Sequence, residues 1–145
     1  MIVEIFPEVR NIQISIHSER KAVAEFLEAL REVLYDANFN VDRNLVVIRK
    51  SKSLEKEQFS TPYTLADLDY DYFDVIDRLK ELTIRDYSET KIDKDDDNPP
   101  LLFVFGKDIN ERMVYIKLKI KGEERRRVLC LSFHYAEKQM EFPYA

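Results

Sequence analysis

The spacing of apolar and polar residues predicts a strand and two helical regions in the first two thirds of the chain, and the short apolar runs at residues 2–6 and 45–48 fit two further strands. In residues 12–16 isoleucine alternates with polar residues, which is the period of a half-buried strand. Ser18 can then cap a helix of about 18 residues, in which apolar side chains recur every three or four positions. A second helical region starts at Thr64 and has a break near Tyr70, with an apolar face that contains Phe73, Ile76 and Leu79.

The last third of the chain predicts three strands of an antiparallel meander. The runs LLFVFGK, RMVYIKLKIK and RRRVLCLSFHY are strand-like, and short polar connections separate them. Side chains alternate between the two faces of a strand, so each run has an apolar and a more polar set. The apolar set, expected to face the helices, is Val114, Ile116, Leu118, Ile120, Leu129, Leu131 and Phe133. The opposite set contains Tyr115, Lys117, Lys119, Cys130, Ser132 and His134.

These elements predict a single α+β domain over residues 1–145, with two or three helices packed on one face of an antiparallel sheet. Residues 1–18 are expected to form an N-terminal strand extension, and residues 19–90 to be mainly helical. The meander occupies residues 101–135, after a charged, proline-terminated loop.

Composition excludes several classes of protein. The chain has 145 residues, of which 45% are apolar, and no apolar run approaches the roughly 20 residues that would span a bilayer. We therefore expect a folded protein without a membrane segment, and its N-terminus shows no secretory signal. Cys130 is the single cysteine and cannot form an internal disulfide, so the reducing cytoplasm is the expected compartment.

Charge is distributed unevenly along the chain. The net charge of -5 by itself argues against a partner that is a nucleic acid. Residues 1–100 carry a balance of -8, however, while residues 101–145 carry +3. The predicted meander is thus basic, and the whole-chain charge says little about what its polar face binds.

Four stretches of the sequence resemble one known family. They are DLDYDYFDVIDRLKELTIRDYSE, LFVFGKDI, VYIKLKI and LSFHYAEKQMEFPY, and they cover roughly positions 65 to 144. They resemble the MqsR family of toxins from prokaryotic type II toxin-antitoxin modules, within the RelE-like group of small ribonucleases. The resemblance implies a RelE-like fold, cleavage of messenger RNA without a metal or cofactor, and inhibition by a cognate antitoxin protein.

The resemblance also implies where the site lies. The tyrosine and lysine of the VYIK strand are Tyr115 and Lys117, and His134 stands where well-known relatives carry a lysine and others carry SFH. A further lysine of those relatives corresponds to Glu89 here, with Lys91 nearest to it.

Metal-free RNA cleavage needs a base for the 2′-hydroxyl, an acid for the leaving 5′-oxygen and positive charge for the phosphate. His134 titrates near neutral pH and can act as base or acid. Lys117 and Lys107 can neutralise the phosphate, while Tyr115 can stack on a base or donate a proton. The residues expected to bind RNA beside them are Lys119, Arg125, Arg126 and Arg127.

Each candidate has an ordinary structural explanation as well. Tyrosine and lysines on the polar side of a strand can form a solvated face, and Arg125 to Arg127 beside two glutamates can protect an edge strand. The aspartates at 93–97 lack the pattern of a calcium loop, and no zinc motif or glycine-rich phosphate loop is present. The sequence therefore supports a ribonuclease toxin, with a non-catalytic binding or regulatory protein that kept the fold as the alternative; the oligomeric state is not indicated.

Overall fold

The computed structural model describes residues 14–92 and 101–145 and shows an α+β fold. Residues 2–6, Ile12 and the aspartates at 93–97 lie outside the described residues. Within the described part, the strands form one six-stranded sheet in the order β1-β3-β4-β5-β6-β2. Their bounds are Ile14–Ile16 (β1), Leu45–Val47 (β2), Tyr87–Ile92 (β3), Leu102–Ile109 (β4), Arg112–Lys121 (β5) and Arg127–Tyr135 (β6).

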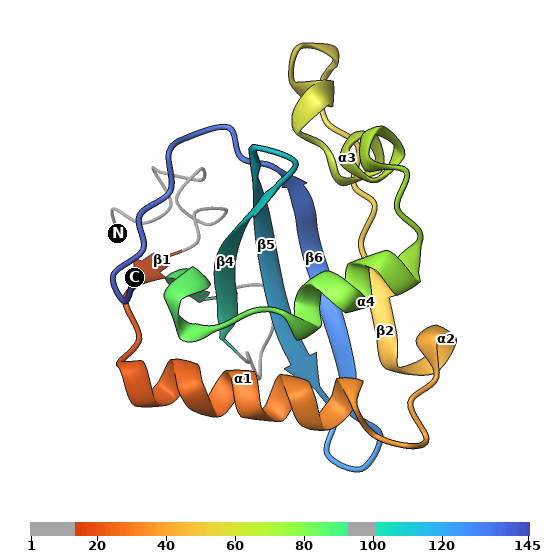
Figure 1. Cartoon of the computed structure of the whole chain (residues 1–145), viewed down its shortest axis with the longest axis vertical. Coiled ribbons are helices and arrows are strands. Elements are labelled where there is room, and N and C mark those ends of the chain that lie inside the picture. The colour runs from red at the N-terminus through yellow and green to blue at the C-terminus, as the bar shows by residue number, and fades with distance from the viewer. Residues whose placement is uncertain (1–13, 93–100) are drawn as a thin grey trace, which may run out of the picture.

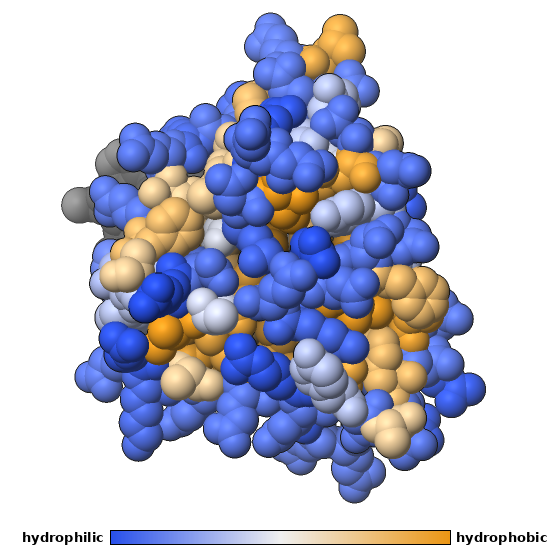
Figure 2. Space-filling view, viewed as in Figure 1, coloured by the Kyte–Doolittle hydropathy of each residue, from blue (hydrophilic) through white to orange (hydrophobic). Residues whose placement is uncertain are grey.

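The helices precede the meander, and α1 (Arg20–Leu34) and α4 (Tyr72–Lys80) cover one face of this sheet (Figure 1). The other α-helices are α2 (Val41–Asn44) and α3 (Thr61–Leu68), and the 3₁₀ helices are η3 (Leu54–Phe59) and η4 (Ile84–Asp86). Helices α1 and α4 lie across the strands, and Figure 2 shows this helix-covered side as mostly hydrophilic. In the part of the chain that is described, no helix is long and apolar enough to cross a membrane.

The core lies between α1, α4 and the sheet. Phe26 of α1 stacks on Phe103 of β4 with ring centroids 4.2 Å apart, and Val23, Leu27 and Leu30 of the same helix are buried. Burial of such side chains contributes about 1.5 to 3 kcal/mol each, so this apolar stripe fixes the helix on the sheet. The periodicity that predicted α1 is confirmed, although Glu19 rather than Ser18 is its N-cap residue.

One prediction about the sheet needs correction. The sheet is mixed rather than antiparallel, because β2 runs parallel to β6 at one edge. Strand β2 falls within the short apolar run at residues 45–48, but its parallel pairing joins distant parts of the chain, and local periodicity does not reveal such pairing.

The meander of β4, β5 and β6 is confirmed, and a tight hairpin joins its first two strands. Asn110 and Glu111 have φ values of 52° and 68° in the connection between β4 and β5. Positive φ at both central residues is the geometry whose twist suits a two-residue hairpin.

A bulge in β6 changes the faces that its residues occupy. Lys117 pairs with Ser132, but the next residue of β5, Leu118, pairs with Cys130, so Leu131 is an extra residue. Ser132, Phe133 and His134 keep the predicted faces. Cys130, however, is fully buried in the core, whereas Leu129 and Leu131 lie on the side of the sheet away from α1 and α4. The prediction was wrong for these three residues because one inserted residue inverts the alternation before it.

Candidate functional site

A cavity of about 1070 Å³ lies on the sheet face opposite α1 and α4. Its floor comes from β3, β5 and β6, and its walls come from residues 48–52 after β2 and residues 136–141 after β6. In Figure 1 the chain leaves β6 and crosses to the side of the sheet where β1 lies. The cavity therefore combines the meander with two segments that lack regular structure.

Tyr115 and His134 form the centre of this floor. They are directly opposite each other on β5 and β6, and their rings stack with centroids 5.1 Å apart and planes inclined by 13°. A cross-strand pair in an antiparallel ladder holds two side chains at a fixed spacing. The predicted juxtaposition of Tyr115 and His134 thus results from the register of the meander.

The His134 ring has two chemically different nitrogens. Nδ1 lies 2.9 Å from the carbonyl oxygen of Tyr135, and a carbonyl oxygen can only accept a hydrogen bond. Nδ1 therefore carries the proton of the neutral ring, and Nε2 keeps a lone pair. Burial lowers the pKa of His134 below its usual value, and Lys52 and Lys117 act in the same direction. The hydrogen bond to Tyr135 raises the pKa of His134 and opposes these effects, but burial outweighs it, so the neutral ring is favoured and its Nε2 can accept a proton.

Burial has the opposite consequence for Tyr115. It raises the pKa of the phenol to about 12, and the nearby Glu89 carboxylate adds to this increase. Tyr115 therefore remains protonated at neutral pH and can donate a hydrogen bond. One ring of the stacked pair is suited to accept a proton and the other to donate a hydrogen bond.

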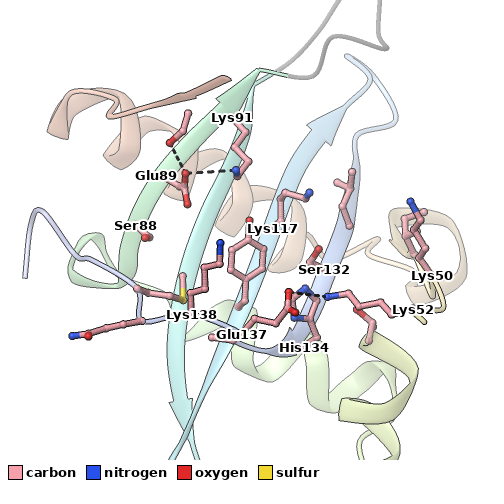
Figure 3. Close-up of a pocket in the computed structure, with 18 of the residues that line it drawn as sticks. Lys50, Lys52, Ser88, Glu89, Lys91, Lys117, Ser132, His134, Glu137 and Lys138 are labelled. Atoms are coloured by element: carbon pink, nitrogen blue, oxygen red, sulfur yellow. Dashed lines mark hydrogen bonds and ion pairs between the residues drawn. The ribbon is translucent and has the colours of Figure 1, made fainter. Parts of the chain in front are cut away.

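Lysines surround the stacked pair. Among the described residues, the cavity is lined by five of them, namely Lys50, Lys52, Lys91, Lys117 and Lys138. Lys117 lies on the floor, two residues after Tyr115 and opposite Ser132. Figure 3 shows it between Glu89 and Lys91 on one side of the cavity and His134, Glu137 and Lys52 on the other. Glu89, Glu137 and Glu141 also line the cavity, so the lysines exceed the glutamates by two, and this positive balance suits an anionic ligand.

Glu137 ties two of the segments together near His134. Its carboxylate lies 3.3 Å from Lys56 Nζ and 4.0 Å from Lys52 Nζ, so the tail after β6 is linked to η3 and to the residues before it. The hydrogen bond from Lys56 lowers the pKa of Glu137 and keeps it ionised. The two walls of the cavity are thereby linked to each other.

Helix α3 supports the strand that carries His134. The hydroxyl of Thr61 accepts a hydrogen bond of 3.1 Å from the Phe133 amide, and that of Thr64 accepts one of 3.0 Å from the Tyr135 amide. Strand β2 pairs with β6 only as far as Cys130. The two threonine hydroxyls thus supply hydrogen-bond acceptors to backbone amides of β6 at the point where β2 no longer pairs with it.

Five of the predicted site residues lie outside the cavity. Lys107 follows the core residue Phe105 by two positions on β4, so its side chain lies on the same, helix-covered face of the sheet. There its Nζ lies 3.4 Å from Glu81 Oε1. Lys119 shares the face of Lys117 but is only 4% exposed and does not line the cavity. The other three, Arg125, Arg126 and Arg127, line a separate hollow beyond the end of β5.

Sequence reasoning missed the charged residues on the walls. Lys50 and Lys52 fall in a polar stretch that has no periodicity, and Glu137 follows the last strand. Only Glu89 and Lys91 carried a usable signal, since they alternate along β3 and both face the cavity. Comparisons of the chain with protein-family models, with curated proteins and with solved structures found no match.

Proposed function

We propose that this protein is a metal-independent ribonuclease that cleaves single-stranded RNA at the Tyr115–His134 cavity. The observation that carries the proposal is the stacked pair itself, in which a neutral histidine and a protonated tyrosine lie together in a cavity that lysines line. RNA contains its own nucleophile, the 2′-hydroxyl, so the protein needs only proton transfer and charge stabilisation.

The reaction assigns one role to each residue of the floor. His134 Nε2 takes the proton from the 2′-hydroxyl as O2′ attacks the adjacent phosphorus and the P–O5′ bond breaks. The Lys117 ammonium neutralises the charge that accumulates on the phosphoryl oxygens. Tyr115 donates a hydrogen bond from its phenolic hydroxyl to the departing O5′ and keeps its own proton. O5′ takes its proton from a water molecule of the solvent, and His134 afterwards releases the proton from the 2′-hydroxyl to the solvent. The products are a 2′,3′-cyclic phosphate and a 5′-hydroxyl.

The biological setting is part of the same proposal. The sequence resemblance to MqsR toxins, within the RelE-like group, supports a toxin whose activity a cognate antitoxin masks by covering the cavity. The α+β fold agrees with that setting without identifying it, because one fold serves many functions.

The direct test is incubation of the purified chain with a mixed-sequence RNA in EDTA, followed by analysis of the new ends. We expect 5′-hydroxyl and cyclic phosphate ends. His134→Ala should reduce the rate roughly a hundred- to ten-thousand-fold, and Tyr115→Phe roughly a hundredfold. Added imidazole should restore part of the activity of His134→Ala.

Tyr63→Phe is the matched control, because Tyr63 is 39% exposed on α3 and lies outside the cavity. Its rate should equal that of the unmodified chain, and thermal unfolding should show all three variants folded. RNA that stays intact at high protein concentration would refute the proposal that this protein is a ribonuclease. RNA that is bound with a dependence on Lys117 but not cut would favour the non-catalytic binding protein.

A further inference from the structure

Glu89 places a negative charge where a polyanion is expected to bind. It lies on β3 and lines the cavity, with its side chain 26% exposed. In the sheet register Glu89 is opposite Val104, which is in turn opposite Lys117, so the carboxylate and the floor lysine lie in one row across the strands. A carboxylate repels phosphate, and its position beside a phosphate-neutralising lysine therefore calls for another role.

The contacts of Glu89 fix one of its two oxygens. The Ser15 hydroxyl donates to Oε1, and Lys91 Nζ lies 3.7 Å from the same oxygen. Figure 3 shows both interactions on the side of the cavity away from His134. Within the described residues the structure gives Oε2 no hydrogen-bond partner, while an ionised carboxylate has about four acceptor positions. Glu89 is thus held at one oxygen and keeps acceptor capacity at the other.

We infer that Glu89 reads a nucleobase of the RNA by accepting a hydrogen bond at Oε2 from an exocyclic amino group. This inference rests on the proposed function, because it concerns the strand that the same cavity would hold. Carboxylates accept from amino groups of bases in the same way that they accept from cytosine N4 in DNA recognition. Unpaired bases of single-stranded RNA expose these edges for such contacts.

The chemistry predicts which base is rejected. Adenine, cytosine and guanine each carry an amino group, whereas uracil presents two carbonyl oxygens that flank one imino hydrogen. A carboxylate has no hydrogen to donate to those carbonyls and is repelled by them. The nucleotide that contacts Glu89 should therefore be A, C or G, and U should be disfavoured roughly tenfold or more.

The test is the nucleotide profile around the cut sites in a randomised RNA library. For the unmodified chain, U should be depleted at one fixed position relative to the cut. In Glu89→Gln the depletion should fall by about tenfold, because the amide can donate to uracil carbonyls. Glu89→Ala, which removes the acceptor, should lose the depletion as well. A role of Glu89 confined to holding Lys91 would alter the rate and leave the profile unchanged.

Glu141→Gln is the matched control, since Glu141 also lines the cavity and the change removes the same charge. Its profile should match that of the unmodified chain. If Glu89 variants cut RNA with the original profile, the inference is overturned while the ribonuclease stands.

A binding measurement separates the inference from catalysis. Single-stranded 2′-O-methyl oligonucleotides of A, C or U cannot be cut by 2′-hydroxyl attack. The unmodified chain should bind A and C about tenfold more tightly than U, and Glu89→Gln should remove the difference. If these binding differences are found but the protein does not cleave RNA, recognition of the base by Glu89 is supported and the proposed ribonuclease activity is refuted. Equal binding of the A, C and U oligonucleotides would overturn the inference.

Discussion

At the scale of single residues, the environment of His134 decides which proton transfer it can perform. The hydrogen bond from Nδ1 to the Tyr135 carbonyl sets the tautomer, and burial disfavours the charged ring. The neighbouring Tyr115 responds to the same burial by holding its proton more tightly. Burial thus favours the neutral form of His134 and the protonated form of Tyr115. A neutral histidine beside a protonated tyrosine is the pattern expected of a base and a hydrogen-bond donor.

This environment predicts the pH dependence of cleavage. Only the neutral form of His134 can act as a base, and its pKa is lowered from its usual value of 6.5. The rate constant kcat/KM should therefore rise with pH through a midpoint below 6.5 and level off by neutral pH. Measurement of kcat/KM against pH, together with an NMR titration of His134, checks this expectation. A rate that falls as the pH rises through the same midpoint would assign His134 the role of an acid instead.

Ser18 shows how a residue that fits one local role can serve another. Its hydroxyl lies 2.7 Å from that of Thr90, and its backbone amide donates to the Tyr87 hydroxyl over 2.9 Å. Tyr144 donates to the Ser18 carbonyl over 2.6 Å. Ser18 therefore joins the start of α1, strand β3 and the C-terminal tail.

At the scale of elements, β6 depends on support that changes along its length. Its first half pairs with β2, and its second half receives the hydroxyls of Thr61 and Thr64 from α3. The bulge at Leu131 lies between these two halves. The register with β5 places Ser132 and His134 on the cavity face and Phe133 in the core, and the bulge inverts the faces only of the residues before it.

Removal of the Thr64 hydroxyl should weaken this support. Thr64 is fully buried, so Thr64→Val leaves the Tyr135 amide without its acceptor and should destabilise the fold by about 1 to 3 kcal/mol. Hydrogen exchange at the Tyr135 amide should become faster. Thr64→Ser keeps the hydroxyl and should keep the protection of that amide, even though it loses a methyl group. Unchanged exchange in the valine variant would show that the hydrogen bond contributes nothing to β6.

At the scale of the whole molecule, the charge at the cavity differs from the net charge of the chain. The chain carries a net charge of -5, whereas the described residues that line the cavity include five lysines and three glutamates. Charges separated by more than about 10 Å are largely screened at physiological salt. A polyanion in the cavity would therefore be attracted by the cavity's own lysines, and acidic residues on the helix-covered side would have little effect on it.

RNA binding should accordingly weaken with salt in spite of the negative net charge. The logarithm of the binding constant should fall linearly with the logarithm of the salt concentration, by about 0.7 for each phosphate contact. Lys117→Gln should reduce the magnitude of the slope by about 0.7. Lys21→Gln is the matched control, because Lys21 is 86% exposed on α1 and pairs with Glu25 there at 3.9 Å. A slope that Lys117→Gln leaves unchanged would place the phosphates elsewhere.

Local sequence determined those features that depend on neighbouring residues. The three-and-four spacing of apolar residues specified α1, and period-two alternation specified the three strands of the meander. That alternation also placed Tyr115, Lys117 and His134 together, since direct cross-strand pairs follow from the register. These predictions held because each depends on residues close together in the chain or on adjacent strands.

Tertiary structure alone decided the parallel pairing of β2, the bulge and the walls of the cavity. β2 joins the sheet beside β6, although more than 80 residues separate Leu45 from its partner Val128. The extra residue at Leu131 moved Cys130 into the core, and Lys107 turned away to Glu81. Contacts between distant residues carry no periodic signal, because packing and backbone hydrogen bonding across the whole fold determine them.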